Sequence, residues 1–288
     1  MSILRGIWNT SAIVANTLIM GIPLILITLL KWVPGLRTPV THVLVWIADQ
    51  WGAQNDALLR FGGALRLSIV GDEPPSPNDW TLIISNHQTW VDIFVLHCTL
   101  TRRVAPIKFF LKSELIWLPI IGIACWALDF PFMKRYSREY LERHPERRGK
   151  DLEATRRACA AFARRPASLL NFLEGTRLTA AKHRAQQSPF PHLLKPRAGG
   201  LAFVLASLGD RMDHIVDATI VYPQGAPSFW SFMCGRCPEV ILHLQNRPVP
   251  RDLSSGDYMD DPAFREALQT WVTELWAEKE RRLQALLT

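Results

Sequence analysis

The chain has 288 residues, of which 48% are hydrophobic and 20% are charged, and this is sufficient for a large core in one or two domains. The formal net charge of +7 favours anionic partners such as nucleic acid, an anionic membrane surface or a phosphorylated substrate. Five cysteines, odd in number and scattered, do not fit a secreted disulfide framework, so the composition favours a reducing compartment.

The N-terminal part of the chain is strongly apolar. Residues 12–30 contain no charged side chain and are just long enough to span the hydrocarbon core of a bilayer. A cleaved signal is not indicated, because Arg5 is the only cation before this run and no small-residue cleavage pattern follows it. A second apolar stretch, at 40–48, is too short to span, so a single span and a hairpin that enters the membrane and returns both remain open. We therefore expect residues 1–63 to anchor the protein to a membrane as one helix or a helical hairpin.

The rest of the chain alternates between strand and helix patterns. An amphipathic helix from about residue 46 runs into a strand at 64–70, and a loop with three prolines follows at 71–79. Further strands are predicted at 80–85, 105–111, 168–173 and 215–222, an extended segment at 127–133, and helices at 93–101, 113–122, 147–163, 199–208 and 261–287. This alternation predicts an α/β domain over 64–288, with a central, mostly parallel sheet flanked by helices.

The first candidate site is the stretch Ser-Asn-His-Gln-Thr-Trp-Val-Asp at 85–92, which directly follows a predicted buried strand. Residues five apart on a regular helix diverge by about 140°, so His87 and Asp92 can meet only if a turn separates the strand from the next helix. A carboxylate on one imidazole nitrogen fixes the tautomer and leaves the other nitrogen as a base. The alternative is a core histidine and a surface aspartate. Because α/β folds build sites at the carboxyl ends of buried strands, we favour a base and the residue that orients it.

A second motif, Glu174-Gly-Thr-Arg177, ends the predicted strand at 168–173 in the same way. Gly175 permits close approach of the backbone to a ligand, and Thr176 offers a hydroxyl group. Arg177 presents a planar fork suited to phosphate, and Glu174 would hold this arginine in place. A plain ion pair between strand and loop is the alternative interpretation.

The segment at 134–157 is basic, with a local net charge of +4, and such runs are usually solvated helix faces. Lys134 and Arg135 differ from the rest, because they follow the apolar residues 129–133 and so lie where a buried strand would reach the surface.

Together, the two motifs resemble the glycerolipid acyltransferase family, whose best-known members are the lysophosphatidic acid acyltransferases. Two further stretches agree. Residues 112–122 look like a family block with Lys112, Glu114 and Leu115, then Pro119 and Gly122. Residues 129–135 resemble the second block in the form found in eukaryotic and some bacterial homologues, and the short strand that ends at Pro223 matches the fourth block loosely. The resemblance covers residues 66–225.

This resemblance implies transfer of a fatty acyl group from acyl-coenzyme A or acyl carrier protein to the free hydroxyl of lysophosphatidic acid, which gives phosphatidic acid. Another lysophospholipid or hydroxyl-bearing lipid is the alternative acceptor. His87 would be the general base and Asp92 would orient it. The implied substrate-binding residues are Glu174, Gly175, Thr176 and Arg177, with Lys112 and Arg135 as helpers. The resemblance implies neither a cofactor nor a metal, and we expect the inner membrane of a bacterial cell, with the active site on the cytoplasmic side.

Other classes of function are less well supported by the residues. A non-catalytic lipid-binding protein would keep the fold, but it would not need both motifs. A metal-dependent hydrolase lacks a third ligand in either motif, and the lone pair Cys234 and Cys237 is a weak metal signal. Nucleic acid is not an expected partner, because the tryptophans cluster with the apolar segments and do not interleave with the basic run. Direct transfer is favoured over an acyl-enzyme, although Ser85 is near His87 in the sequence.

Overall fold

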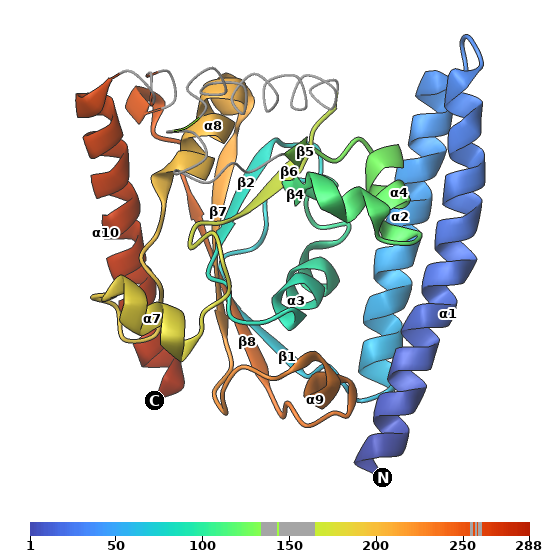
Figure 1. Ribbon diagram of the computed structural model, residues 1–288, viewed down its shortest axis with the longest axis horizontal. Coiled ribbons are helices and arrows are strands. Elements are labelled where there is room, and N and C mark those ends of the chain that lie inside the picture. Colours follow the sequence, from blue (N-terminus) through green and yellow to red (C-terminus); the bar gives the residue numbers. More distant parts are fainter. Residues whose placement is uncertain (134–142, 144–164, 254–255, 257, 259–260) are drawn as a thin grey trace.

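The computed structural model describes residues 1–133, 143, 165–253, 256, 258 and 261–288. The predicted helix at 147–163 lies outside the described residues, as do Lys134 and Arg135. Figure 1 shows a central sheet with helices on both faces and a pair of long helices along one side.

The central sheet has six strands, and its order explains where polar side chains can gather. The order is β1 (Leu67–Gly71), β8 (Val240–Arg247), β7 (His214–Val221), β2 (Thr81–Ser85), β6 (Ser168–Phe172) and β3 (Ile107–Phe109). All neighbouring strands are parallel except β7 and β8. The predicted mostly parallel sheet is therefore confirmed, and β2, β6 and β7 place their carboxyl ends at one edge.

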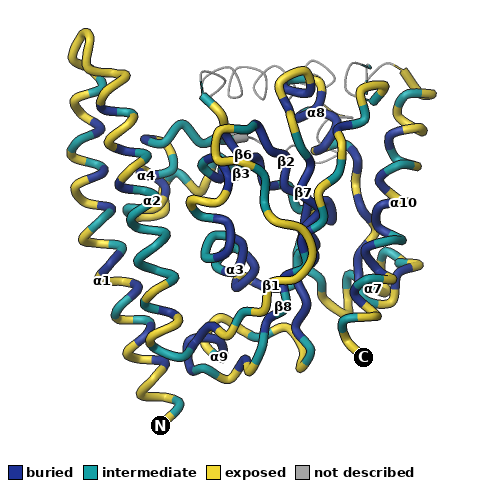
Figure 2. The backbone as a smooth tube through the Cα atoms, turned by 180° about the vertical axis from the view of Figure 1, so that it is seen from behind, coloured by how far each residue is buried: buried dark blue, intermediate teal, exposed yellow. Residues whose placement is uncertain are grey.

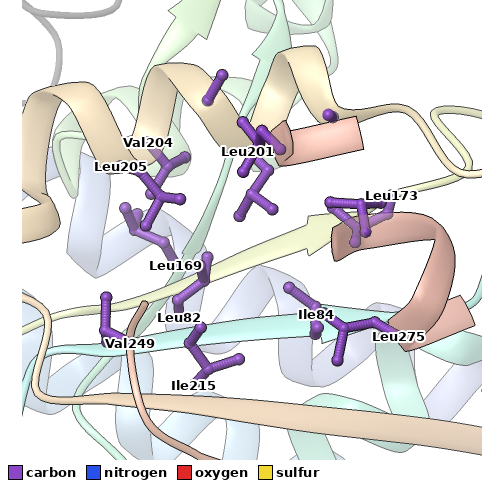
Figure 3. Packing of buried hydrophobic residues seen from close by; sticks show 14 of the residues in the cluster. Leu82, Ile84, Leu169, Leu173, Leu201, Val204, Leu205, Ile215, Val249 and Leu275 are labelled. Atoms are coloured by element: carbon purple, nitrogen blue, oxygen red, sulfur yellow. The ribbon is translucent and has the colours of Figure 1, made fainter. Parts of the chain in front are cut away.

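Alternating side chains of the strands form two cores, one on each face of the sheet. Leu82 and Ile84 of β2 face one core, and Ile83 between them faces the other. Figure 3 shows the first core, in which Leu82, Ile84 and Leu169 meet side chains of the covering helices. These helices are α8 (Ala198–Leu208) and α10 (Pro262–Leu287), whereas α3 (Val91–Leu100) and α9 (Phe229–Met233) contribute to the second core.

Two long helices form an N-terminal helical hairpin. Helix α1 (Ser2–Thr28) continues into a 3₁₀ turn, η1 (Leu29–Trp32), and α2 (Arg37–Phe61) returns beside it, as both views show. Asn16 Nδ2 donates to Asn55 Oδ1 at 2.8 Å, and Asn9 Nδ2 donates to Met233 O at 2.8 Å. The predicted apolar stretch at 40–48 and the predicted amphipathic helix that begins near residue 46 are both parts of α2.

In the described part of the chain, the stretch Ser2–Trp32 alone is long and apolar enough to cross a bilayer. Many of its large apolar side chains are exposed, and exposed segments follow α1 along its length in Figure 2. The division of the chain at residue 63 stays an interpretation, since α1 and α2 also pack against α3, α4 and α9.

The segment after β3 differs from the predicted helix at 113–122 and the extended segment at 127–133. It contains β4 (Leu111–Lys112), a 3₁₀ turn η2 (Ser113–Trp117), α4 (Ile121–Ala127) and β5 (Phe132–Met133), which pairs with β4. Pro119 lacks the N–H that a continuous helix requires, and Ile120 has a positive φ of 63°, so the chain turns sharply there. The helix consequently begins eight residues later than the apolar pattern suggests.

Strand β8, the short helices α7 (Ala180–Gln186) and α9, and the 3₁₀ turns η4 (Gly209–Arg211) and η5 (Arg251–Leu253) were not predicted from the sequence. Val240, Leu242 and Leu244 are buried at alternate positions, so a period-two pattern was present in β8. The other predicted strands and helices in the described residues match observed elements with small shifts at their ends.

Candidate active site

The first motif begins where β2 leaves the sheet. Asn86 is buried, and its side chain bridges to the neighbouring strand. Its Nδ2 donates to Ile220 O at 2.9 Å, and its Oδ1 accepts from Ile220 N at 2.9 Å. The side-chain amide of Asn86 therefore makes the two hydrogen bonds with β7 that a backbone residue of β2 would make. This contact fixes the direction in which the chain turns towards His87.

His87 and Asp92 meet as predicted, because α3 begins only at Val91. His87 Nδ1 lies 2.8 Å from Asp92 Oδ2, and the N–H groups of Gln88 and Thr89 donate to the same oxygen at 2.6 and 2.9 Å. The Tyr222 hydroxyl donates to Asp92 Oδ1 at 2.7 Å. Asp92 is fully buried and accepts from all these donors, so it is a carboxylate and Nδ1 carries a hydrogen. The lone pair of the imidazole is consequently on Nε2.

The His87 ring is held by residues from both neighbours of β2. It stacks on Phe172, the last residue of β6, with ring centroids 4.0 Å apart and an angle of 16° between the planes. Tyr222 directly follows β7, and burial, aided by the Asp92 charge, raises its pKa, so it stays a hydrogen-bond donor. The His87 side chain is 14% exposed, and its Nε2 has no hydrogen bond with any described residue. The arrangement leaves one basic nitrogen accessible.

Glu174 does not hold Arg177, and that expectation is wrong. Glu174 is 1% exposed, and in the described residues neither carboxylate oxygen has a hydrogen bond of regular geometry. Burial raises its pKa to about 8, although the backbone N–H groups of His87 and Leu194 act in the opposite direction. The neutral form is therefore favoured at pH 7. The cause of the separation is Gly175, which turns the chain with a φ of 66° between the buried Glu174 and the half-buried Arg177.

The second motif packs directly against the first. The Arg177 guanidinium lies 4.5 Å from the centroid of the Trp90 ring, a cation–π contact that links the two motifs. Leu178 N also donates to His87 O at 2.8 Å. Thr176 Oγ1 accepts from Lys182 Nζ at 2.5 Å. An anion bound by Thr176 and Arg177 would accordingly lie close to His87.

Of the two predicted helpers, Lys112 is not part of this group. Lys112 ends β4 and is exposed, and its ammonium has no recorded hydrogen bond or ion pair with described residues. Arg135 lies outside the described residues. The structure thus brings together His87, Asp92 and residues 174–177, and it reveals Tyr222 and Phe172 as contacts that sequence reasoning missed.

Ser85, Cys234 and Cys237 do not join the group. Ser85 is buried, and its Oγ donates to Asn86 O at 3.1 Å and not to His87. Cys234 and Cys237 are buried free thiols, and Cys237 belongs to the second core. Among the described residues, no three His, Cys, Asp or Glu side chains gather where they could hold a metal ion.

An apolar cavity of about 240 Å³ lies between α2, α3, α4 and β3. Its lining includes Phe94 of α3, Phe109 of β3 and Ile121 of α4. His97 also lines it, and burial lowers the pKa of this histidine to about 4, so it is neutral at pH 7. Phe109 pairs with Leu170 in the sheet, and Phe172, two residues further along β6, has its side chain on the same face. Aromatic side chains therefore extend from the cavity towards His87.

Comparison with known proteins adds independent findings. The family model described as Acyltransferase matches residues 66–223. Lysocardiolipin acyltransferase 1 of Danio rerio is 31% identical over 259 residues, covering 83% of this chain and 61% of the relative. The 1-acyl-sn-glycerol-3-phosphate acyltransferase epsilon of Mus musculus is 24% identical over 241 residues, covering 76% of this chain and 61% of the relative. The chain spans about three fifths of the length of these curated relatives.

A solved structure has the same fold. The crystal structure of the 1-acyl-sn-glycerophosphate (LPA) acyltransferase from Thermotoga maritima matches with a TM-score of 0.57 and 14% identity, covering 99% of this chain and 98% of that one. This likeness concerns the fold alone. Because the family model spans more than half of the chain and includes both motifs, the chain belongs to the acyltransferase family.

Proposed function

We propose that the protein transfers a fatty acyl group from acyl-coenzyme A or acyl carrier protein to the free hydroxyl of a lysophospholipid, with lysophosphatidic acid as the simplest acceptor. The observation that carries the proposal is the accessible Nε2 of His87, whose ring is fixed by the buried Asp92 carboxylate.

In the proposed reaction, His87 Nε2 takes the proton of the acceptor hydroxyl while the hydroxyl oxygen attacks the thioester carbonyl carbon. The carbon–sulfur bond then breaks, and the leaving thiolate takes the proton from the imidazolium. Asp92 stabilises the imidazolium between the two steps. Base catalysis of this kind contributes about 10²–10⁴-fold, so the positioning of both substrates must supply the remainder.

Two neighbouring features support the substrate classes. Thr176 and Arg177 present a hydroxyl and a guanidinium next to His87, where the phosphate of a glycerol phosphate would lie if its hydroxyl reached Nε2. The mostly apolar cavity offers a space for the acyl chain. Its wall includes Phe94, which follows Asp92 by two residues on α3, so one helix serves both the base and the cavity.

A lipid surface is the proposed environment of α1 and α4. Exposed large apolar side chains continue from α1 onto η2 and α4, where Trp117 is 85% exposed and Trp126 is 46% exposed. Helix α1 packs directly against α4, so the two exposed surfaces adjoin. Exposed apolar surface of this extent favours contact with a membrane. The inner membrane of a bacterial cell, with the site on the cytoplasmic side, stays a prediction.

A second acceptor is favoured by one observation. The relatives from Danio rerio and Gallus gallus, at 31% and 30% identity, are both named lysocardiolipin acyltransferases. Lysocardiolipin offers the same chemistry as lysophosphatidic acid, a free hydroxyl on a glycerol that carries a phosphate.

The test is acyl transfer by the purified, detergent-solubilised protein, with labelled oleoyl-coenzyme A offered together with a panel of lysophospholipids. We expect labelled phosphatidic acid or labelled cardiolipin, and the preferred acceptor would be the one with the higher kcat/KM. Absence of transfer from both coenzyme A and carrier-protein donors would contradict the proposal and favour a non-catalytic lipid-binding protein.

A further inference from the structure

The loop that carries Arg177 belongs to a stretch with a one-sided charge balance. Residues 175–197 contain five Lys or Arg residues and no Asp or Glu. The five are Arg177, Lys182, Arg184, Lys195 and Arg197. None of them forms an ion pair with a carboxylate of any described residue. Cations without acidic partners favour an anionic ligand, and two of the five, Lys182 and Arg197, lie next to the loop of the proposed phosphate site.

Lys182 reaches the second motif from α7. Its Nζ donates to Thr176 Oγ1 at 2.5 Å and to Arg177 O at 3.2 Å. An ammonium group has three N–H donors, so one donor is left for a ligand. The two bonds hold this charge beside Thr176.

Arg197 is a second cation next to the same loop. Its backbone N–H donates to Leu173 O at 2.8 Å, which ties the residue to the end of β6. Its Cδ lies 3.7 Å from the position that a Cβ on Gly175 would take, so the side chain passes close to the glycine. Arg197 directly precedes α8, and the positive end of that helix adds to the local potential.

Nearby carboxyl groups of the described residues do not form ion pairs with these cations. Glu174 is buried and favours its neutral form, since burial raises its pKa to about 8. Glu280 of α10 already accepts from the backbone and ring of His192. The loop and its two flanking cations therefore carry more positive charge than one phosphate monoester requires.

We propose that Lys182 and Arg197 bind a second phosphate of the acceptor, next to the phosphate assigned to Thr176 and Arg177. The matching ligand class is a lysophospholipid whose headgroup holds two phosphates joined through glycerol. This inference rests on the proposed function. It favours lysocardiolipin, which has two phosphates, over lysophosphatidic acid, which has one.

The experiment compares the wild type with the double variant Lys182→Gln/Arg197→Gln in mixed micelles. KM is measured for monolysocardiolipin and, separately, for oleoyl lysophosphatidic acid, at a saturating donor concentration. We expect KM for monolysocardiolipin to rise about tenfold or more, and at least fivefold more than KM for lysophosphatidic acid, because only the former loses charge-assisted contacts to its second phosphate.

The matched control is Arg184→Gln, which removes a cation from the exposed side of the same helix, α7. It should not change the ratio of the two KM values. Equal rises of KM for both acceptors in the double variant would overturn the proposal, because Lys182 and Arg197 would then only position Arg177.

A donor comparison separates the acceptor from the coenzyme as the source of the phosphates. The same variants are assayed with oleoyl-coenzyme A and with oleoyl-N-acetylcysteamine, a thioester without phosphate. The proposal expects the loss of monolysocardiolipin affinity with both donors. A loss confined to KM for oleoyl-coenzyme A would assign these cations to the coenzyme and would contradict the proposal.

Binding of the headgroup alone tests the site without turnover. Calorimetry on the full chain in detergent compares glycerol 1,3-bisphosphate with glycerol 3-phosphate. The wild type and Arg184→Gln should prefer the bisphosphate, and the double variant should lose that preference. If the wild type prefers the bisphosphate but transfers no acyl group, the proposed function is contradicted and the second phosphate site is still supported. Equal binding of both compounds by the wild type would overturn the second phosphate site.

Discussion

Two buried polar clusters use the same strand, β7, and they differ in what they leave open. At its carboxyl end, Tyr222 and two backbone N–H groups hold Asp92, which in turn holds His87. On the face covered by α10, Asp217 forms ion pairs with Lys279, Arg247 and Arg282. Burial would raise the pKa of Asp217, but the three cations outweigh it and hold that pKa below its usual value.

In the second cluster the charged side chains bind one another, whereas in the first cluster His87 Nε2 has no partner among the described residues and is accessible. Lys279 is fully buried, and its Nζ donates to Ala218 O at 2.7 Å and to Thr219 Oγ1 at 3.2 Å. No comparable contact with a described residue occupies His87 Nε2. Buried charge alone therefore does not identify a reactive site, and the difference between a structural and a catalytic cluster lies in the unoccupied lone pair.

The largest expected effect comes from breaking the open cluster at its centre. Asp92→Asn replaces an acceptor of several hydrogen bonds by an amide, so the His87 tautomer is no longer fixed and the imidazolium loses its counter-charge. We expect kcat to fall by about 10²–10⁴-fold. Steady-state acyl transfer measures the effect, with circular dichroism as the control for folding. A fall in kcat below threefold in a folded variant would show that Asp92 does not orient the base.

Breaking the closed cluster should change stability and not the chemistry. Asp217→Asn leaves three cations without their shared carboxylate, and removal of one partner of a buried pair costs about 3–5 kcal/mol. Urea unfolding would measure the free energy of unfolding, and kcat per folded molecule should stay near the wild-type value. The matched control, Asp217→Leu with Lys279→Met, should recover much of the loss. A large fall in kcat for folded Asp217→Asn would place this cluster in catalysis.

A smaller effect on kcat is expected for Tyr222, the residue that follows β7. Tyr222→Phe removes one of the donors to Asp92 and leaves the His87 contact in place. A hydrogen bond to a charged group contributes about 1.5–3 kcal/mol, part of which stabilises the fold, so we expect kcat to fall about tenfold. Comparison of pH–rate profiles provides a readout specific to the base. An unchanged kcat and an unchanged profile would limit Tyr222 to a structural role.

The last effect concerns Glu174 and the pH dependence of stability. Its pKa is raised from 4.5 to about 8 by burial, so the folded state holds an extra proton between these values. Stability contributed by this group is consequently complete below about pH 4.5, falls by up to about 1.4 kcal/mol per pH unit as pH rises, and levels off above pH 8. Urea midpoints from pH 5 to 8 should fall less steeply in Glu174→Gln. Parallel slopes would contradict a neutral buried Glu174.

The sequence predicted the parts of the site that are close in the chain. His87 and Asp92 are five residues apart, and a buried strand before them with a helix after them was sufficient to expect their contact. Tyr222 and Phe172 were missed because they come from β7 and β6. Only the order of the strands brings them beside β2, and no local pattern reports that order.

Other errors have equally local causes. The expected link between Glu174 and Arg177 failed because the positive φ of Gly175 separates the two side chains. Lys182 was missed because its helix, α7, has no apolar stripe, and its ammonium reaches Thr176 only through the fold. The helix at 113–122 was misplaced because apolar periodicity outweighed the break that Pro119 imposes.

The most direct test of the central claim compares single-turnover acyl transfer by the wild type and His87→Ala, from labelled oleoyl-coenzyme A to the preferred lysophospholipid. His87→Gln serves as a second variant that fills the space without a basic nitrogen. We predict a loss of at least about 10²-fold in both folded variants, with unchanged association with lipid vesicles. Transfer within a few-fold of the wild-type rate in either variant would contradict the role of the accessible His87 nitrogen as the base.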